Sequence, residues 1–231
     1  MSEFYRKASS GHEYFILNGL NLEISAVINN SILPAFRNGK VLDIGCGEQP
    51  LKKYFEQTHL YKGLDHCQNS KNNIDYLTTI DNPRLSLEDQ FDIIICTEVM
   101  EHVFDWKIAF ENMAKLCTAS GVILITCPMF YPLHEEPYDF WRPTPYAISK
   151  FAELNGFNIV LEKRIGDGKD ILGTLLSYSY FYPQDKKLST IISAKLVNRV
   201  RNFILKKLFK SNRILMESPF FMSNLFLLKK N

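Results

Sequence analysis

The chain alternates short runs of consecutive apolar residues with longer stretches in which apolar residues recur at every third or fourth position. Continuous apolar runs are typical of strands buried on both faces of a parallel sheet. Such runs occupy residues 41–44, 91–96 and 121–128, and the second holds three consecutive isoleucines. Weaker strand patterns lie at residues 61–66, 74–79 and 157–161. The pattern therefore predicts an α/β fold.

Amphipathic helices are predicted between the strands. Residues 1–37 carry a regular apolar face, formed by Ile16, Leu20, Ile24, Ile28 and Ile32. A helix over residues 106–117 would end at Ser120–Gly121, because glycine suits the left-handed position after a helix. A helix over residues 145–154 has a suitable N-cap in Thr144 and a proline, Pro145, in its first turn.

The first strong strand breaks into a glycine turn, Gly45-Cys46-Gly47, after Asp43. Glycine allows positive φ and a close approach of the backbone to a ligand. We expect a helix beginning near Pro50, whose free N–H groups would point at that ligand. A strand, a glycine turn and a helix together indicate a nucleotide-type site. The turn is not the dinucleotide fingerprint, because a third glycine is missing.

The turn resembles motif I of the class I S-adenosylmethionine-dependent methyltransferases, in which two hydrophobic residues, an acid and another hydrophobic residue precede Gly-x-Gly. The resemblance implies a Rossmann-like seven-stranded sheet of order 3-2-1-4-5-7-6, with an antiparallel last strand and helices on both faces. It also implies S-adenosyl-L-methionine as the cofactor. N-terminal segments of this family often close over the site, so residues 1–37 either cap it, with Tyr5 and His12 nearby, or pack on the sheet.

Cofactor-binding residues are predicted at the ends of successive strands. Asp65 ends the second strand about 20 residues after the glycine turn, where a carboxylate can accept hydrogen bonds from ribose hydroxyls. By resemblance, Asp81 reaches the adenine amino group, with Asp75 as the alternative. Residues 91–103 resemble motif IV of ubiquinone-biosynthesis O-methyltransferases. The full predicted set is Asp43, Gly45, Cys46, Gly47, Asp65, His66, Asp81, Asn82, Cys96 and Glu98.

The loop at residues 129–144 is the predicted acceptor site, because it follows the fifth strand and contains three prolines and five aromatic residues. It resembles a His-x-x-Pro-x-Asp-x-x-Arg-x-Thr element of methyltransferases associated with cell-envelope polysaccharide pathways. A hydroxyl acceptor must lose its proton, and histidine is suited to take it at neutral pH. The candidate catalytic residues are His134, His102 and Asp139. The candidate substrate residues are Tyr138, Trp141 and Arg142. Alternatively, His134 only ties down the loop.

A second use of these residues involves a metal ion. Glu98, Glu101 and His102, followed by a distant histidine, resemble the divalent-metal set of small-RNA 2′-O-methyltransferases. Carboxylates and imidazoles could hold Mg²⁺ or Mn²⁺ against a diol. The same pattern is also found where Glu101 and His102 merely begin a helix, and our preferred assignment contains no metal.

Composition narrows the class of protein. The 231 residues are 46% hydrophobic and 23% charged, which is typical of a globular protein. We expect one methyltransferase domain over residues 1–231: an N-terminal helical cap at 1–37, a cofactor-binding core at 38–165, a basic helical insertion at 166–221 and a final strand at 222–231.

No apolar run is long enough to span a membrane, and the N-terminus has no hydrophobic signal core, so a cytoplasmic location is predicted. The five cysteines include no CxxC pair, which favours reduced, buried thiols over a zinc site or disulfides.

The charge is divided unevenly between the two parts of the chain. Residues 186–231 have 11 basic residues and one acidic residue, whereas residues 1–185 have 16 and 24. Apolar residues recur at helical spacing among the nine cations of residues 186–213. A basic amphipathic helix of this kind could lie on the inner face of an anionic membrane. A partner helix or a solvated face would fit the pattern equally well.

The preferred interpretation is methyl transfer from S-adenosylmethionine, most simply to an oxygen atom of a small-molecule or carbohydrate-like acceptor. One alternative is a metal-dependent RNA 2′-O-methyltransferase, which the acidic catalytic part disfavours because it offers no surface for phosphates. The other is a non-catalytic scaffold that binds an adenosyl ligand. Neither the acceptor nor the oligomeric state follows from these residues.

Overall fold

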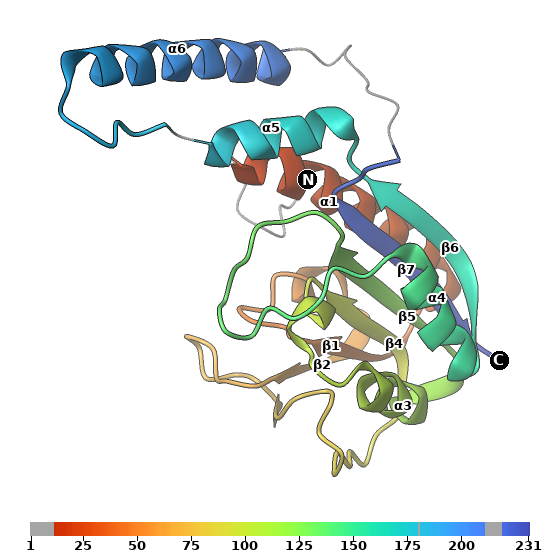
Figure 1. The fold of residues 1–231 in the computed structure, drawn as a ribbon. Helices are drawn as coiled ribbons and strands as arrows, with labels where there is room; N and C mark the ends of the chain where they lie inside the picture. The colour runs from red at the N-terminus through yellow and green to blue at the C-terminus, as the bar shows by residue number, and fades with distance from the viewer. Residues whose placement is uncertain (1–11, 180, 211–218) are drawn as a thin grey trace.

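The computed structural model describes residues 12–179, 181–210 and 219–231, and these contain one seven-stranded mixed sheet (Figure 1). The strand order is β3-β2-β1-β4-β5-β7-β6. All neighbouring pairs are parallel except the two formed by β7, which is antiparallel to both β5 and β6. The strands are β1 (Gly39–Ile44), β2 (His59–Asp65), β3 (Tyr76–Leu77), β4 (Phe91–Thr97), β5 (Cys117–Pro128), β6 (Phe157–Ile165) and β7 (Ser223–Lys230). The predicted fold class and strand order are confirmed.

The central strands are buried on both faces, as their apolar runs predict. In β4, Ile94 packs into the core on one face, whereas Ile93 and Ile95 pack into the core on the other. This alternation follows from the two-residue period of a strand. The first face is covered by α3 (Trp106–Leu116) and α4 (Pro145–Leu154), and the second by α1 (His12–Val27). The sheet is therefore the middle of three layers.

The described part of the N-terminal segment packs on the sheet. The helix α1 runs into a π-helical turn, η1 (Ile28–Ile32), and a short helix, α2 (Leu33–Ala35). Leu20, Ile24 and Ile28 are fully buried and belong to the same core as Ile93 and Ile95. Packing, rather than capping, accounts for this apolar face. Tyr5 lies outside the described residues, as does the His12 side chain.

The structure corrects two of the predicted helix boundaries. No α-helix follows the glycine turn, where a single 3₁₀ turn, η2 (Lys52–Tyr54), takes its place. Gln49, the residue before the predicted start at Pro50, has a φ of +57°, which lies outside the helical region, and the residues between η2 and β2 form turns. The helix α3 ends at Leu116, so Gly121 does not stop it. Gly121 instead lies within β5, beside an irregular register with β4, where a Cβ atom would stand 2.6 Å from the Cys117 Sγ atom.

The insertion between β6 and β7 contains two helices, α5 (Gly168–Tyr178) and α6 (Leu188–Lys210). Asp167 caps α5 by accepting hydrogen bonds from the backbone N–H groups of Lys169 and Asp170, and the Asp170 carboxylate accepts one from the Asp167 N–H in return. The helix α5 contacts α1, and α6 contacts α5 (Figure 1). Among the described helices, none is long and apolar enough to cross a membrane.

Candidate functional site

A cavity of about 580 Å³ opens at the carboxyl ends of β1, β2 and β4, where chain connections leave the sheet in opposite directions. Ligands of open α/β sheets bind at such a switch point, and the volume is in the range of small-molecule sites. Its wall is formed by Ile44, Gly45, Gly47, Leu64, Asp65, His66, Cys67, Thr78, Thr79, Ile80, Asp81, Glu98, Val99, His102, Val103, Glu135 and Tyr138.

The glycine turn forms the floor of this cavity. Gly45 has a φ of +64°, and its N–H donates a hydrogen bond to the Leu64 carbonyl at 2.8 Å. A Cβ atom at this position would stand 2.3 Å from a methyl carbon of Val99. Gly47 has a φ of +48°, and a Cβ atom there would meet open space. Glycine is therefore required at residue 45 by both backbone conformation and packing, and at residue 47 by conformation.

Asp65 lies on the wall beside the turn, at the end of β2. Its carboxylate accepts hydrogen bonds from the backbone N–H of Gly47 at 2.9 Å and of Cys67 at 3.3 Å, which fix its orientation. The Nδ1 atom of His66 lies 2.9 Å from the same carboxylate, although most of the His66 side chain is exposed. Each carboxylate oxygen has two lone pairs, so Asp65 retains acceptor capacity toward the cavity. A ligand hydroxyl group that donates to the Oδ2 atom fits this arrangement.

Four predicted cofactor residues do not reach the wall. Asp43 is buried and accepts a hydrogen bond from the Tyr61 hydroxyl; burial raises the pKa of Asp43 to about 7, against the effect of that hydrogen bond. The side chains of Cys46 and Cys96 are buried in the interior. Asn82 donates to the Thr78 hydroxyl and accepts from the Arg84 N–H, so it shapes the loop.

The two candidate adenine acids differ in position. Asp81 lies on the wall, where its carboxylate accepts a 3.4 Å hydrogen bond from the Asp105 N–H. Asp75 is engaged elsewhere, in an ion pair with Lys62 at 2.8 Å and a hydrogen bond from the Gly63 N–H. The geometry therefore favours Asp81 over Asp75 as the residue that contacts a ligand.

Glu98 extends the wall beyond β4, from a backbone with a φ of +54°. Its Oε1 atom accepts a 3.0 Å hydrogen bond from the Ser223 hydroxyl at the start of β7. Burial raises the pKa of Glu98 to about 7, and the hydrogen bonds that it accepts do not offset this. Such a carboxyl group changes its charge near neutral pH.

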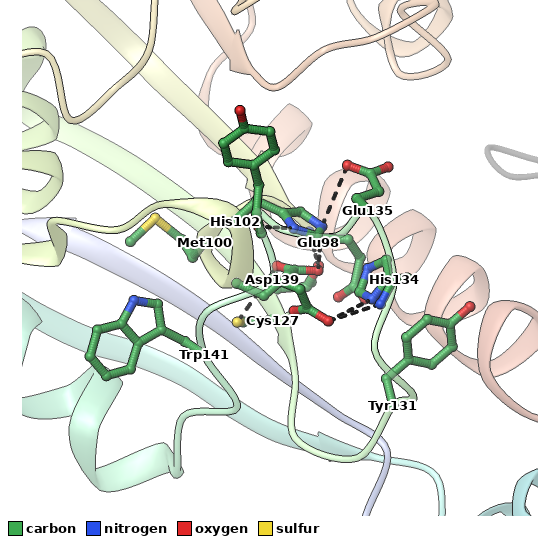
Figure 2. A network of polar contacts seen from close by, with 12 residues as sticks. Glu98, Met100, His102, Cys127, Tyr131, His134, Glu135, Asp139 and Trp141 are labelled. Atoms are coloured by element: carbon green, nitrogen blue, oxygen red, sulfur yellow. Dashed lines mark hydrogen bonds and ion pairs between the residues drawn. The ribbon is translucent and has the colours of Figure 1, made fainter.

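The loop at residues 129–144 is held by a buried ion pair. Arg142 donates two hydrogen bonds to Asp139, at 2.6 and 2.7 Å, and the Asp139 side chain is 1% exposed. Burial alone would raise the pKa of Asp139, but the Arg142 hydrogen bonds and the His134 N–H outweigh it and bring the pKa to about 2. Asp139 also lies 3.2 Å from the Nδ1 atom of His134 and so orients that ring (Figure 2).

Of the catalytic candidates, His102 reaches the cavity wall. Its Nδ1 atom lies 2.8 Å from the Tyr138 carbonyl, so Nδ1 carries the proton and Nε2 is left with its lone pair. The Nε2 atom lies 3.8 Å from a carboxyl oxygen of Glu101. It lies equally far from a carboxyl oxygen of Glu135, as Figure 2 shows. The His134 ring stands beside it, with ring centroids 4.7 Å apart. His134, Asp139, Trp141 and Arg142 lie outside the wall, whereas Tyr138 is part of it.

Glu101 is a buried carboxyl group that is only partly satisfied by hydrogen bonds from the described residues. Its side chain is 1% exposed, and its Oε1 atom has no hydrogen-bond partner within residues 12–179, 181–210 and 219–231. Burial, followed by the nearby charge of Glu98, raises the pKa of Glu101 well above its ordinary value. One ligand atom each from Glu101, His102 and His134 lie within 4.8 Å of one another, which is close enough to share a metal ion.

Several wall residues were not predicted from the sequence. Thr78 and Thr79 carry no motif, Val103 ends the motif IV-like segment but was not singled out, and Glu135 lies on an irregular loop. Val99, which a Cβ atom at Gly45 would meet, lies in the motif IV-like segment but was not singled out. Of the five cysteines, four are buried and free, but Cys67 is exposed, which corrects the prediction for that residue.

A seven-stranded sheet of this order, with a glycine turn after β1 and an acid at the end of β2, defines a class I S-adenosylmethionine-dependent methyltransferase. Solved structures share this fold. A methyltransferase from Archaeoglobus fulgidus is 18% identical, with a TM-score of 0.55 and coverage of 90% of this chain and 94% of that chain. The magnesium protoporphyrin IX methyltransferase of Synechocystis PCC 6803, with bound S-adenosylhomocysteine, is 13% identical, with a TM-score of 0.56 and coverage of 99% and 90%.

Sequence comparison gives the family. The model described as "Methyltransferase domain" matches residues 20–158, so the chain belongs to this family of S-adenosylmethionine-dependent methyltransferases. The ubiquinone biosynthesis O-methyltransferase of Bartonella quintana is 33% identical over 108 residues, which cover 42% of this chain and 43% of that relative. The match thus spans less than half of that relative's length.

Proposed function

We propose that the enzyme transfers a methyl group to a hydroxyl oxygen of a small-molecule or carbohydrate-like acceptor, with His102 taking the hydroxyl proton. The observation that carries this proposal is the free Nε2 atom of His102 on the cavity wall, with Nδ1 held by the Tyr138 carbonyl. A general base needs an available lone pair and a fixed ring. His102 has both.

The cavity fits the cofactor, because the open space above Gly47 and the carboxylates of Asp65 and Glu98 face the same volume. Bound S-adenosylmethionine supplies a methyl group on a positively charged sulfur. Asp65 would accept hydrogen bonds from the ribose, and Glu98 would offset positive charge. The remaining task of the protein is to align the acceptor oxygen and to exclude water.

The proton balance is simple. As the acceptor oxygen gains the methyl group, its hydroxyl proton passes to Nε2 of His102, and the resulting imidazolium is stabilised by the Glu135 carboxylate at 3.8 Å. His134 and Asp139 hold the loop against this ring. Exposed aromatic rings beside the cavity offer flat surfaces for a sugar or an aromatic acceptor: Phe104, Tyr138, Phe140 and Trp141.

The test uses methyl-labelled cofactor and a panel of hydroxylated acceptors. His102→Gln should lower kcat by about 10² to 10⁴-fold, the usual contribution of a general base. The affinity for S-adenosylhomocysteine should stay within about twofold of wild type, since binding that ligand needs no base. The carbon chemical shift of a transferred ¹³C-methyl group then distinguishes an ether from an N-methyl product. Unchanged kcat in His102→Gln would refute the assignment of the base, and an N-methyl product would refute the acceptor class.

A divalent metal is the second candidate, favoured by the unpartnered Oε1 atom of Glu101. Glu101, His102 and His134 would hold Mg²⁺ or Mn²⁺, which would polarise the acceptor hydroxyl. Because the pKa of Glu101 is raised, metal binding must displace its proton. Calorimetry with each ion in buffers of different ionisation enthalpy would detect that release. Under the preferred mechanism no binding is seen, and activity survives EDTA.

A further inference from the structure

The insertion between β6 and β7 presents an exposed apolar face that the catalytic site does not use. On α6, Leu188, Ile192, Leu196, Val200 and Phe203 follow one another at intervals of three or four residues, and each is more than half exposed. Residues at this spacing lie on one side of a helix. Figure 1 shows α6 beyond α5, on the side away from the strands. We call these five residues the α6 outer face.

The opposite side of α6 is fixed to the protein, so the outer face cannot turn inward. Leu208 is buried. The Asn198 side chain, 8% exposed, accepts a hydrogen bond from the Phe181 N–H at 3.1 Å and donates one to the Phe181 carbonyl at 2.8 Å. A buried amide with both groups satisfied locks α6 against the loop that leads into it. The outer face is therefore held in a defined position toward solvent.

Cations border this face. Lys195, Arg199 and Lys206 are exposed and fall on one flank of the α6 outer face by helical geometry, and Lys207 lies within it. None of these four forms an ion pair with any residue that the structure describes. The printed sequence of α6 contains no acidic residue. An apolar face flanked by unpaired cations is the composition of a helix that lies in the interface of an anionic bilayer.

Other occupants fit less well. A symmetric contact with a second copy would bring two cationic helices together, at a repulsive cost. Lysine is also depleted in protein interfaces, whereas a bilayer accepts it because the ammonium group reaches the headgroups while its stem stays apolar.

We propose that the α6 outer face binds the surface of an anionic lipid bilayer, with α6 parallel to the membrane and its apolar side chains in the acyl boundary. No described helix can cross a membrane, which agrees with a helix that lies on one. The catalytic cavity lies in the sheet layer and would remain in the aqueous phase. The proposal does not depend on the identity of the methyl acceptor.

Vesicle co-sedimentation of the full chain tests the proposal. Vesicles of phosphatidylcholine alone are compared with vesicles that also contain phosphatidylglycerol, at low and high salt. Wild type should pellet only with the anionic vesicles and only at low salt, because such attraction is screened within a Debye length of about 8 to 10 Å. Each engaged cation contributes about fivefold in affinity.

Three variants make the test specific. Changing Lys195, Arg199, Lys206 and Lys207 to Gln should lower the affinity by about a hundredfold or more. Changing Ile192, Leu196 and Phe203 to Ser should abolish binding, although these exposed side chains are not needed for the fold. The matched control changes Lys71, Lys107, Lys115 and Lys150 to Gln, which removes the same charge from outside α6. It should bind as wild type does.

The outcomes are distinct. No pelleting of wild type with anionic vesicles at low salt would overturn the proposal, as would equal loss of binding in the control and in the α6 charge variant. Sedimentation velocity of wild type and of each variant tests whether the α6 outer face binds a second copy of the chain instead. Self-association that is lost in the Ser variant, without vesicle binding by wild type, would assign the α6 outer face to a second copy. Unchanged melting temperatures show that the variants are folded.

Discussion

Binding of the positively charged cofactor should depend on the ionisation of Glu98. This carboxyl group lies on the cavity wall, and burial raises its pKa from an ordinary 4.5 to about 7. S-adenosylmethionine carries a sulfonium and an ammonium group, so it should bind the ionised form of Glu98 more tightly than the protonated form. Affinity is therefore expected to rise with pH through about 7, and Glu98→Gln should remove the part of this rise that Glu98 supplies.

The size of the effect follows from the pKa. With a pKa of about 7, about one tenth of the Glu98 carboxyls are ionised at pH 6 and about nine tenths at pH 8. If only the ionised form binds, the apparent affinity is proportional to the ionised fraction, and it rises by up to about tenfold between these pH values. In Glu98→Gln the affinity should change between pH 6 and pH 8 only by the amount that the other titrating groups contribute.

Calorimetry of S-adenosylmethionine binding at pH 6, 7 and 8 provides the assay. The ligand's own amine and the cavity residues His66 and His102 are the same in Glu98→Gln and cancel in the comparison, whereas the pKa of Glu101 falls when the charge of Glu98 is removed. Asp43→Asn is the matched control, because Asp43 has a similarly raised pKa but does not reach the wall. An equal pH dependence in wild type and Glu98→Gln would refute the reasoning, as would its loss in Asp43→Asn.

Three further predictions concern stability and can be checked by urea denaturation. Gly45→Ala should lower the free energy of unfolding by about 2 kcal/mol or more, because the new Cβ atom would stand 2.3 Å from a Val99 methyl carbon and because alanine disfavours the left-handed backbone at this residue. An unchanged urea midpoint would contradict this. Wild type should lose stability as pH rises from about 4 to about 7, because the pKa of Asp43 in the folded protein lies above its ordinary 3.8. Asp43→Asn has no such group, so its free energy of unfolding should rise relative to that of wild type over this window, by at most on the order of 4 kcal/mol. A constant difference between the two proteins would rule out the raised pKa. Arg142→Ala should cost about 3 kcal/mol by leaving the buried Asp139 carboxylate without its partner, and a loss below about 0.5 kcal/mol would show that water replaces it.

The sheet could be predicted because its signal is local. Strands such as β4 are buried on both faces, so they appear as unbroken apolar runs, and the glycine turn marks where β1 ends. The missing helix after the turn could not be predicted, because the apolar spacing of residues 51–57 favours a helix and does not reveal the positive φ of Gln49.

The site was only partly predictable, for a related reason. Asp65 lies on the wall because strand length and the glycine turn together determine where β2 ends. Cys96 was predicted beside the cofactor, but its position in β4 directs it into the core, and the chain reaches the cavity two residues later through the positive φ of Glu98. Whether His102 or His134 faces the cavity depends on how the loop at residues 129–144 folds back on Glu101. The Glu101 carbonyl accepts hydrogen bonds from the Phe140 and Trp141 N–H groups.

The central claim is that the cavity bounded by the glycine turn and Asp65 is the cofactor site. Calorimetry of S-adenosylhomocysteine binding to wild type and to Asp65→Ala tests it most directly, with Asp75→Ala as the control because that acid lies close by but is paired with Lys62 outside the wall. The account predicts that Asp65→Ala lowers the affinity by about 10 to 150-fold, equivalent to 1.5 to 3 kcal/mol for a charged hydrogen-bond acceptor, while Asp75→Ala stays near wild type. Wild-type affinity in a folded Asp65→Ala protein would contradict the account.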